Sequence, residues 1–184
     1  MRKLFVAATA CCLLTRASAG VPALKVQVCN YSRANSAMIS AGAAVARQIF
    51  HTADIDTVWL IDHPPEPFRL TLQIQPGRPK RPDLRSAAGV AMTDPNPLTS
   101  FLADIFFGNI EEGAVTRTDE IYLLGHVMAH EIGHLLGLTH EPETIMAENW
   151  NARDIRWMQA GRFRFTPTQA EHLRAAIAKR QEVP

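Results

Sequence analysis

Four of the seven histidines in this 184-residue chain lie in one short stretch, which constrains the fold more than any other feature. Residues 130–140 read HEIGHLLGLTH and fit the pattern H-E-x-x-H-x-x-G-x-x-H. On a helix, His130 and His134 lie one turn apart on the same face, where both imidazoles reach a single metal ion. Gly137 can adopt the left-handed conformation that ends a helix, so the chain turns back and His140 supplies a third nitrogen. Three protein ligands leave the fourth tetrahedral position to water, which is typical of a catalytic zinc ion.

Glu131 follows the first of these histidines and is the candidate catalytic base. One zinc ion held by the three histidines would lower the pKa of its water towards neutrality and polarise a scissile carbonyl group. Glu131 would take the proton of that water and pass it to the leaving amine. A purely structural zinc site has no use for this carboxylate and normally closes the fourth position with a protein ligand. The pattern therefore predicts amide hydrolysis.

His126 leaves one alternative open for the metal ligands, because it precedes His130 by four residues. A stripe of His126, His130 and His134 along one helix face could also bind a metal ion. That arrangement would give Gly137 and His140 no role. We therefore keep the ligand set of residues 130, 134 and 140, and we expect His126 near the site entrance or behind a ligand.

The first 19 residues contain the three parts of a secretory signal peptide in the right order. Arg2 and Lys3 are positively charged, and residues 4–14 form an apolar stretch that is too short for a membrane anchor. Residues 17–19 read Ala-Ser-Ala, which matches a signal-peptidase cleavage site. We expect residues 1–19 to be removed and the product to be secreted or periplasmic.

The remaining residues, 20–184, are enough for a single domain with its own core. Signal cleavage removes three basic residues and no acid, so 16 basic and 18 acidic residues remain and the net charge is −2. This balance gives no argument for a nucleic-acid partner. Cys29 is the one cysteine left, so no internal disulfide is expected. No later segment is long and apolar enough to suggest a membrane anchor.

Hydrophobic periodicity predicts five strands, near residues 24–29, 56–61, 70–75, 87–92 and 101–107. Apolar residues at three- and four-residue spacing predict a helix between the first two strands, with Ser32 or Ser36 as its N-cap. A strand, a helix and a second strand favour parallel pairing with a right-handed connection. The sheet is therefore expected to begin as a parallel one.

Two capping signatures predict where the later helices begin. Thr116, with Asp119 three residues on, starts the helix that runs to Leu136 and carries the metal ligands. Its expected buried stripe is Ile121, Leu124, Met128, Ile132 and Leu135. Thr166 and Gln169, with proline at the first helical position, start a closing helix.

At these residues the chain resembles the metzincin clan of zinc endopeptidases. The resemblance rests on the whole of residues 130–140 and on Met146, which follows in the run Glu-Thr-Ile-Met. In that clan a methionine turn lies under the metal site, and the resemblance implies this supporting role for Met146. The resemblance covers residues 24–184 and implies an α+β, zincin-like fold. That fold has a twisted, mostly parallel five-stranded sheet, an active-site helix, a methionine turn and a C-terminal helix.

The chain departs from two well-known families of the clan. Only five residues separate His140 from Met146, fewer than expected in matrix metalloproteinases or astacins. Glu141 resembles astacins, but no tyrosine follows Met146 where astacins have a further metal contact. The serine typical of matrix metalloproteinases is also absent. We therefore place the chain in the clan, as a compact bacterial secreted member, and in neither of these families.

The sequence as a whole predicts a secreted zinc endopeptidase that acts on a protein or peptide. The resemblance implies that this substrate lies along the edge strand near residues 87–92 by strand addition. Trp150 and Trp157 are expected in the core or in the wall of a side-chain pocket. Two alternatives remain open: a secreted zinc-containing binding module without turnover, and a zinc amidase acting on a non-protein amide. Glu131 argues against the first, and nothing in the sequence indicates the sugar-binding groove that would favour the second.

Overall fold

A five-stranded sheet forms one layer of the protein in the computed structural model, which describes residues 23–63 and 70–182. The predicted signal peptide lies outside the described residues. The strands are β1 (Leu24–Asn30), β2 (Thr57–Ile61), β3 (Leu70–Gln75), β4 (Gly89–Met92) and β5 (Leu102–Phe106), in the spatial order β2-β1-β3-β5-β4. All neighbours pair in parallel except β4, which runs antiparallel to β5 at the edge. The predicted mostly parallel sheet is therefore confirmed.

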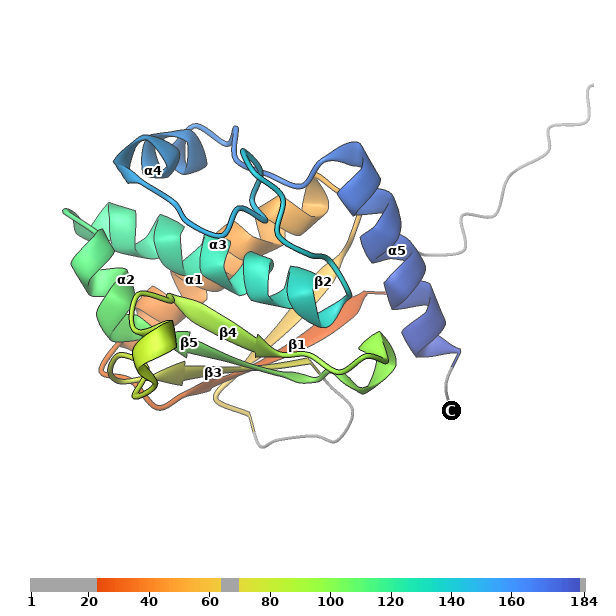
Figure 1. Cartoon of the computed structure of the whole chain (residues 1–184), viewed down its shortest axis with the longest axis horizontal. Helices are drawn as coiled ribbons and strands as arrows, with labels where there is room; N and C mark the ends of the chain where they lie inside the picture. The colour runs from red at the N-terminus through yellow and green to blue at the C-terminus, as the bar shows by residue number, and fades with distance from the viewer. Residues whose placement is uncertain (1–22, 64–69, 183–184) are drawn as a thin grey trace, which may run out of the picture.

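Helices cover one face of this sheet and one of its ends (Figure 1). They are α1 (Ser36–His51), α2 (Phe107–Gly113), α3 (Arg117–Leu135), α4 (Ala152–Gln159) and α5 (Pro167–Gln181), with two short 3₁₀ turns, η1 (Pro82–Leu84) and η2 (Pro97–Thr99). None of the described helices combines the length and the apolar character that crossing a membrane requires. Together with the sheet, these helices form the predicted α+β, zincin-like fold.

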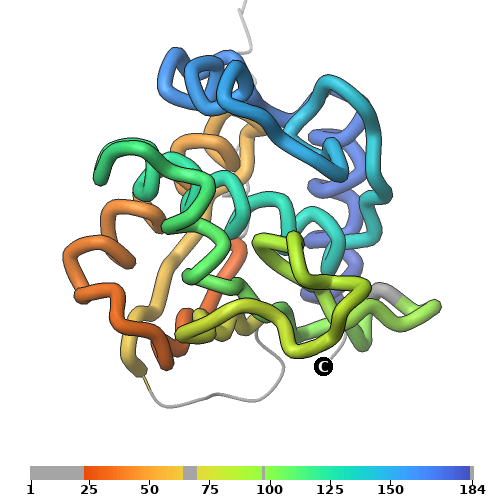
Figure 2. Tube along the Cα trace, turned by 60° about the vertical axis from the view of Figure 1, so that its left-hand side comes forward, coloured from red at the N-terminus to blue at the C-terminus, as the bar shows by residue number. Residues whose placement is uncertain are grey.

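Two glycines bring α1 and α3 close together over the sheet, where the helices run side by side (Figures 1 and 2). A Cβ atom added to Gly125 would lie 2.5 Å from the Cβ of Val45 and 2.6 Å from the Gly42 carbonyl oxygen. A Cβ atom on Gly42 would lie 2.8 Å from Leu124. Both distances are too short for a side chain, so the close approach of the two helices requires glycine. This crossing fixes α3, and with it the histidines, against the core.

The start of α3 agrees with the sequence prediction. The Thr116 hydroxyl accepts a hydrogen bond from the Asp119 backbone N–H (3.1 Å), and the Asp119 carboxylate accepts one from the Thr116 N–H (2.9 Å). This capping box satisfies two amides that the first turn would otherwise leave unpaired. Of the predicted buried stripe, Ile121 is only half-buried, because it lies in the first turns of the helix, and the other four residues are buried.

The predicted N-cap of α1 is wrong. Asn35 caps this helix, since its side-chain oxygen accepts a hydrogen bond from the Met38 N–H (2.9 Å). Ser36 is already the first helical residue. The Ser32 hydroxyl is engaged earlier in the chain, because it donates to the Asn30 side chain (2.7 Å) and accepts from the Ala34 N–H (3.1 Å). The sequence contains three candidate caps within five residues, and only the path of the turn selects one of them.

Helix α5 holds the segment that follows the metal motif. Its Thr166–Gln169 capping box is formed as predicted. The buried Gln169 side chain also donates to the Glu141 carboxylate (2.6 Å) and to the Thr144 hydroxyl (3.3 Å). Near the other end of α5, the Arg180 guanidinium donates to the Leu135 carbonyl oxygen at the end of α3 (2.7 Å). The closing helix therefore anchors both the active-site helix and the turn beyond it.

Candidate metal centre

The ring nitrogens of three histidines converge at the C-terminal half of α3. His134 Nε2 lies 3.0 Å from His130 Nε2 and 3.1 Å from His140 Nε2. Among the described residues, these three form the one group of histidine, cysteine or carboxylate side chains whose ligand atoms all lie within 4.8 Å of one another. Three nitrogens bound to one tetrahedral zinc ion lie about 3.3 Å apart. The separation of the three Nε2 atoms therefore fits a zinc ion.

In His130 and His134, the hydrogen-bond partner of Nδ1 decides which ring nitrogen carries the proton. His130 Nδ1 lies 2.8 Å from the Ile145 carbonyl oxygen, and His134 Nδ1 lies 2.8 Å from the Leu138 carbonyl oxygen. A carbonyl oxygen can only accept, so both Nδ1 atoms donate their hydrogen and both Nε2 atoms present lone pairs. Burial lowers the pKa of His130 to about 4 and also lowers the pKa of His134, which keeps both rings neutral near pH 7. Facing lone pairs repel one another unless a cation lies between them, which is what a metal ligand set requires.

Gly137 ends α3 and allows the chain to bring in the third histidine. Its φ angle is +93°, a left-handed conformation that favours glycine, as the sequence predicts. The Leu138 N–H donates back to the Gly133 carbonyl oxygen (2.9 Å), and the Gly137 N–H donates to the His134 carbonyl oxygen (2.9 Å). These bonds satisfy the last turn of the helix while the chain reverses. His140 then follows within three residues.

Met146 packs against the active-site helix. Its side chain is fully buried, and a Cβ atom added to Gly133 would lie 2.7 Å from the Met146 sulfur. The small residue between the first two ligand histidines therefore provides the room for this sulfur. A hydrogen bond from the Glu141 N–H to the Met146 carbonyl oxygen (2.9 Å) closes the five-residue connection. The preceding residue, Ile145, supplies the carbonyl that orients His130, so this turn also positions a ligand.

Glu131 is buried between α3 and the edge strand. Its side chain is 3 % exposed, and its Oε2 atom has no hydrogen-bond partner. A Cβ atom on Gly89 of β4 would overlap this carboxylate, so the close approach of the strand requires glycine. Burial raises the pKa of Glu131 to about 8, against a smaller lowering by the Ala91 backbone. A desolvated carboxyl group with one oxygen free, beside three convergent histidines, is poised to exchange a proton.

His126 does not lie at the entrance, and that part of the prediction is wrong. The side chain is 2 % exposed. His126 Nδ1 lies 2.8 Å from the Tyr122 carbonyl oxygen, and Nε2 lies 3.2 Å from the Phe163 carbonyl oxygen. Its ring stands edge-on to Trp150, which in turn stands edge-on to His130. His126 therefore packs behind the ligands, and both of its nitrogens face backbone acceptors.

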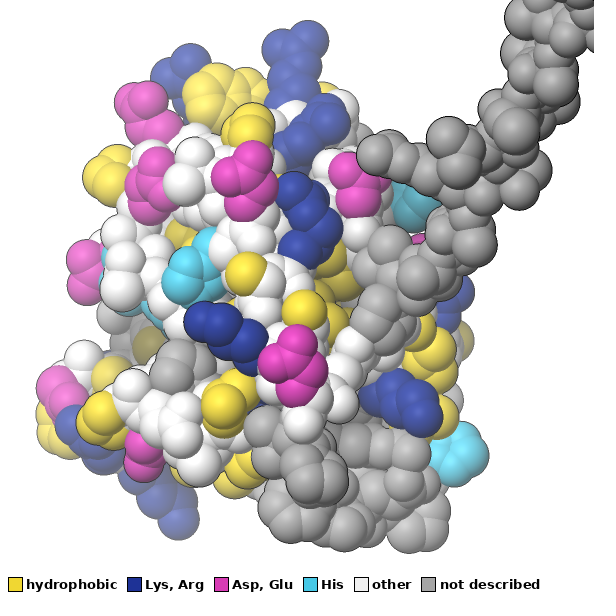
Figure 3. Space-filling view, turned by 90° about the vertical axis from the view of Figure 1, so that its right-hand side faces the viewer, with side chains coloured by type: hydrophobic (Ala, Val, Ile, Leu, Met, Phe, Trp, Pro, Cys, Tyr) yellow, Lys and Arg dark blue, Asp and Glu magenta, His cyan; other side chains and the backbone are white. Residues whose placement is uncertain are grey.

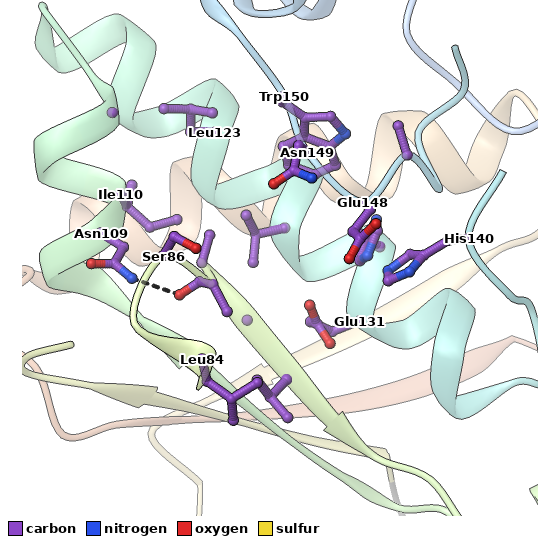
Figure 4. Close-up of a pocket in the computed structure, with 18 of the residues that line it drawn as sticks. Leu84, Ser86, Asn109, Ile110, Leu123, Glu131, His140, Glu148, Asn149 and Trp150 are labelled. Carbon is purple, nitrogen blue, oxygen red and sulfur yellow. Dashed lines mark hydrogen bonds between the residues drawn. The ribbon is translucent and has the colours of Figure 1, made fainter. Parts of the chain in front are cut away.

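A cavity of about 590 Å³ extends from the metal centre between α3, β4 and the chain after Met146. Figure 4 shows Glu131, His140 and Glu148 gathered at one end, with Ile110 and Leu123 towards the other. Trp150 is half-buried and lines the cavity, whereas Trp157 packs against the core beneath Arg153. Both tryptophans therefore pack against the core, as one of the two expectations had it, and Trp150 also forms part of the cavity wall. A second hollow of about 400 Å³ shares Thr93, His134 and His140 with this cavity and continues past Asp94.

The sequence analysis missed three residues that shape this site. Gly89 and Gly133 each leave room for a functional side chain, and Glu148 reaches the cavity two residues beyond the methionine. For Gly133 the signal was present, because it stands inside the histidine motif. For Gly89 and Glu148 no local pattern marks the role, since each depends on a neighbour that is distant in the sequence.

Comparison with known proteins gives a family and a fold. The profile of the peptidase M10 family, the matrixins, matches residues 51–162. The structure resembles a zinc-dependent peptidase from Methanocorpusculum labreanum (TM-score 0.59, 15 % identity, covering 80 % of this chain and 99 % of that one). It also resembles an archaemetzincin from Methanopyrus kandleri (TM-score 0.64, 13 % identity, covering 88 % of this chain and 99 % of that one). No curated protein sequence matches the chain.

Proposed function

The chain belongs to the matrixin family of metallopeptidases, and from this membership we propose that it is an exported zinc endopeptidase with His130, His134 and His140 as ligands of one ion and Glu131 as its base. This match confirms the metzincin clan but replaces the sequence-based placement outside the matrix metalloproteinases. The short connection from His140 to Met146 and the missing serine are therefore differences within the matrixin family. The observation that supports the residue roles best is the convergence of three Nε2 atoms beside a buried carboxyl group whose Oε2 atom has no hydrogen-bond partner.

The three histidines are suited to bind zinc without rearrangement. Carbonyl acceptors on Nδ1 fix the orientation of His130 and His134, so both rings present Nε2 in one tautomer. When bound, zinc supplies Lewis acidity towards a carbonyl oxygen, increases the acidity of a water molecule and favours the ionised form of a nearby carboxyl group. His140 is exposed, so the ligand set opens to solvent on its side.

Glu131 moves the proton in the proposed reaction. Its carboxylate takes a proton from the attacking water and delivers it to the amine that leaves. The position between α3 and β4 shields this group from bulk water, which strengthens its interaction with a nearby cation. Because Gly89 packs directly on the side chain, the carboxylate has little freedom to turn away.

The substrate is proposed to bind as an additional strand along β4. This strand pairs only with β5 among the described strands, and it lines the cavity through Gly89, Val90 and Ala91. An extended peptide hydrogen-bonded to the free edge would pass in front of the three histidines. A substrate that pairs with β4 in this way must have an extended peptide backbone. This mode of binding therefore favours endopeptidase activity over the amidase alternative.

The experiment that tests this function measures peptide hydrolysis and zinc together. The purified protein and its Glu131→Gln variant are incubated with a mixed peptide library, and bound zinc is quantified in both. We expect one zinc ion per chain in each protein and cleavage by the wild type alone. Equal hydrolysis by both proteins would contradict the role of Glu131. Zinc in both without cleavage in either would favour a binding module or a non-peptide substrate.

Export is tested separately. The chain is expressed in full in a bacterial host, and the N-terminal residue of the product in the periplasm or medium is determined. The proposal expects the product to begin at Gly20, immediately after the Ala-Ser-Ala run. Retention of residues 1–19 on a cytoplasmic product would contradict export and leave the enzymatic proposal unaffected.

A further inference from the structure

The two hollows beside the metal centre are lined by acidic side chains and by no described lysine or arginine. We call them together the cleft: the cavity beside Glu131 and the second hollow, which continues past Asp94. The described residues that line the cleft include four acids and no lysine or arginine. The acids are Asp83, Asp94, Glu131 and Glu148. The whole chain has nearly equal numbers of basic and acidic residues, so this segregation is local.

Glu148 differs from the other acids of the cleft because no ion pair, hydrogen bond or catalytic role has been described for it. It is exposed and lies at the same end of the cavity as His140, as Figure 4 shows. The Asp83 carboxylate pairs with Arg81 (2.5 Å), and Glu131 is the proposed base. In the second hollow, one oxygen of the exposed Asp94 accepts from the Asn96 N–H (2.9 Å). Glu148 lines the cavity along Gly89, Val90 and Ala91 of β4, and Asp94 lines the hollow further along the same edge. Both hollows include His134 and His140.

The arginines nearest along the chain to Glu148 do not neutralise the cleft. Four of them are exposed on α4 and in the turn after it, at positions 153, 156, 162 and 164. None of them lines the cleft, to which α4 presents Ala152 and Ile155 instead. Figure 3 shows lysine, arginine and acidic side chains mixed over the outer face that carries α5. The described residues that line the cleft therefore lack the mixture of charges found on the outer face.

Two exposed carboxylates, those of Glu148 and Asp94, give the walls of the cleft their charge. Arg81 offsets Asp83, Glu131 lies beside the three histidines, and no described lysine or arginine lines the cleft to oppose the other two carboxylates. A concave, partly enclosed surface lined with charges of one sign concentrates ligands of the opposite sign. On this basis, and resting on the proposed peptidase function, we propose that the substrate is a basic polypeptide segment with lysine or arginine close to the cleaved bond. Glu148 and Asp94 bind those cationic side chains.

The test compares matched peptides that differ only in charge. One of the peptides cleaved in the library is resynthesised with lysine, norleucine or glutamate at each position within three residues of the cleaved bond. We expect the highest kcat/KM for lysine and the lowest for glutamate. The lysine advantage should shrink as salt is raised, because screening weakens exposed charge pairs.

Variants assign the preference to particular residues. Glu148→Gln and Asp94→Asn should each reduce the ratio of kcat/KM for lysine over norleucine peptides by up to about fivefold, as expected for one exposed ion pair. Glu171→Gln serves as the matched control, since Glu171 is exposed on α5 and lines neither hollow. A direct readout is binding of the same peptides to the zinc-loaded Glu131→Gln protein by calorimetry.

The outcomes separate the two proposals. Equal kcat/KM for lysine and norleucine peptides would overturn the inference and leave the peptidase function standing. Unchanged preference in Glu148→Gln and Asp94→Asn would also overturn it. If no peptide is cleaved at all, the proposed function fails, and calorimetry with the Glu131→Gln protein then decides whether the cleft binds cationic peptides.

Discussion

His126 and His130 lie one helical turn apart on α3, and both are buried, yet the structure gives them different partners. Burial lowers the pKa of each to about 4. Both His126 nitrogens face backbone carbonyl groups, whereas His130 has one nitrogen on a carbonyl and the other on His134. Helical spacing puts all three on one face. The partner of the second ring nitrogen therefore separates a packing histidine from a candidate metal ligand.

The contrast extends to the two halves of α3. The N-terminal half is capped at Thr116 and crosses α1 at Gly125, so it supplies stability. The C-terminal half lies between β4 on one side and the segment after His140 on the other (Figures 1 and 2). There the helix borders the cavity, and the chain reverses direction after Gly137, so side chains from both can reach a substrate. The predictions that follow test this division, from the largest expected effect to the smallest.

The same substitution in the two histidines should have opposite consequences for zinc. His130→Gln removes a ligand, so we expect loss of stoichiometric zinc and of detectable hydrolysis. His126→Gln should retain one zinc ion per chain, because His126 contributes no nitrogen to the centre. Metal analysis after gel filtration and a peptide assay measure both. Loss of zinc in His126→Gln but not in His130→Gln would reverse the assignment.

His126 should make the protein sensitive to acid. In the unfolded chain its pKa is about 6.5, and in the folded protein it is about 4. Between these values only the unfolded chain binds the proton, so the free energy of unfolding falls as the pH drops from 6.5 to 4. Above pH 6.5 neither state is protonated and the contribution is complete. Lowering the pKa of His126 from 6.5 to about 4 corresponds to a full loss of about 3 kcal/mol in the free energy of unfolding.

Urea denaturation of the zinc-free protein at pH 7 and pH 4.5 measures this loss. His126→Gln should show a shallower dependence on pH than the wild type. The other buried histidines titrate in both proteins, so the difference between the two reports on His126. Parallel pH dependences would refute its buried, neutral state.

Gly133→Ala should weaken the metal centre through the methionine turn. A methyl group there would collide with the Met146 sulfur and displace the turn that carries the Ile145 carbonyl. Loss of this support for His130 should reduce zinc affinity by roughly 10- to 100-fold. Competition with a chelator of known affinity measures the change. Gly113→Ala is the control, because a Cβ there makes only an ordinary contact at 3.5 Å.

Thr116→Ala tests the N-terminal half of α3 alone. It removes the hydroxyl that caps the Asp119 N–H, so the free energy of unfolding should fall by about 1 kcal/mol. Zinc content and hydrolysis of the folded protein should not change, because the cap lies more than three helical turns from His130. Thermal denaturation and the peptide assay check the two parts. A large loss of turnover at full folding would show that the halves are coupled.

Features that depend on a few neighbouring residues were predictable. The capping boxes at Thr116 and Thr166, the positive φ angle of Gly137 and the strand of alternating residues at β3 all follow from short patterns. Helices α2 and α4 were missed. Helix α2 begins directly where β5 ends, and α4 buries only Met158, so neither presents a clear apolar stripe.

The sequence by itself determined the ligand set and the base as candidates, because helix geometry places residues four apart on one face and Gly137 can reverse the chain. It also indicated the mostly parallel sheet. Only the tertiary structure decided that His126 packs against Phe163, 37 positions along the chain, and that β4 encloses Glu131 at Gly89. It likewise gathered the acids of the cleft from separate segments. Burial, proton affinity and cleft charge depend on contacts between distant residues, whereas caps and helix faces depend on neighbours.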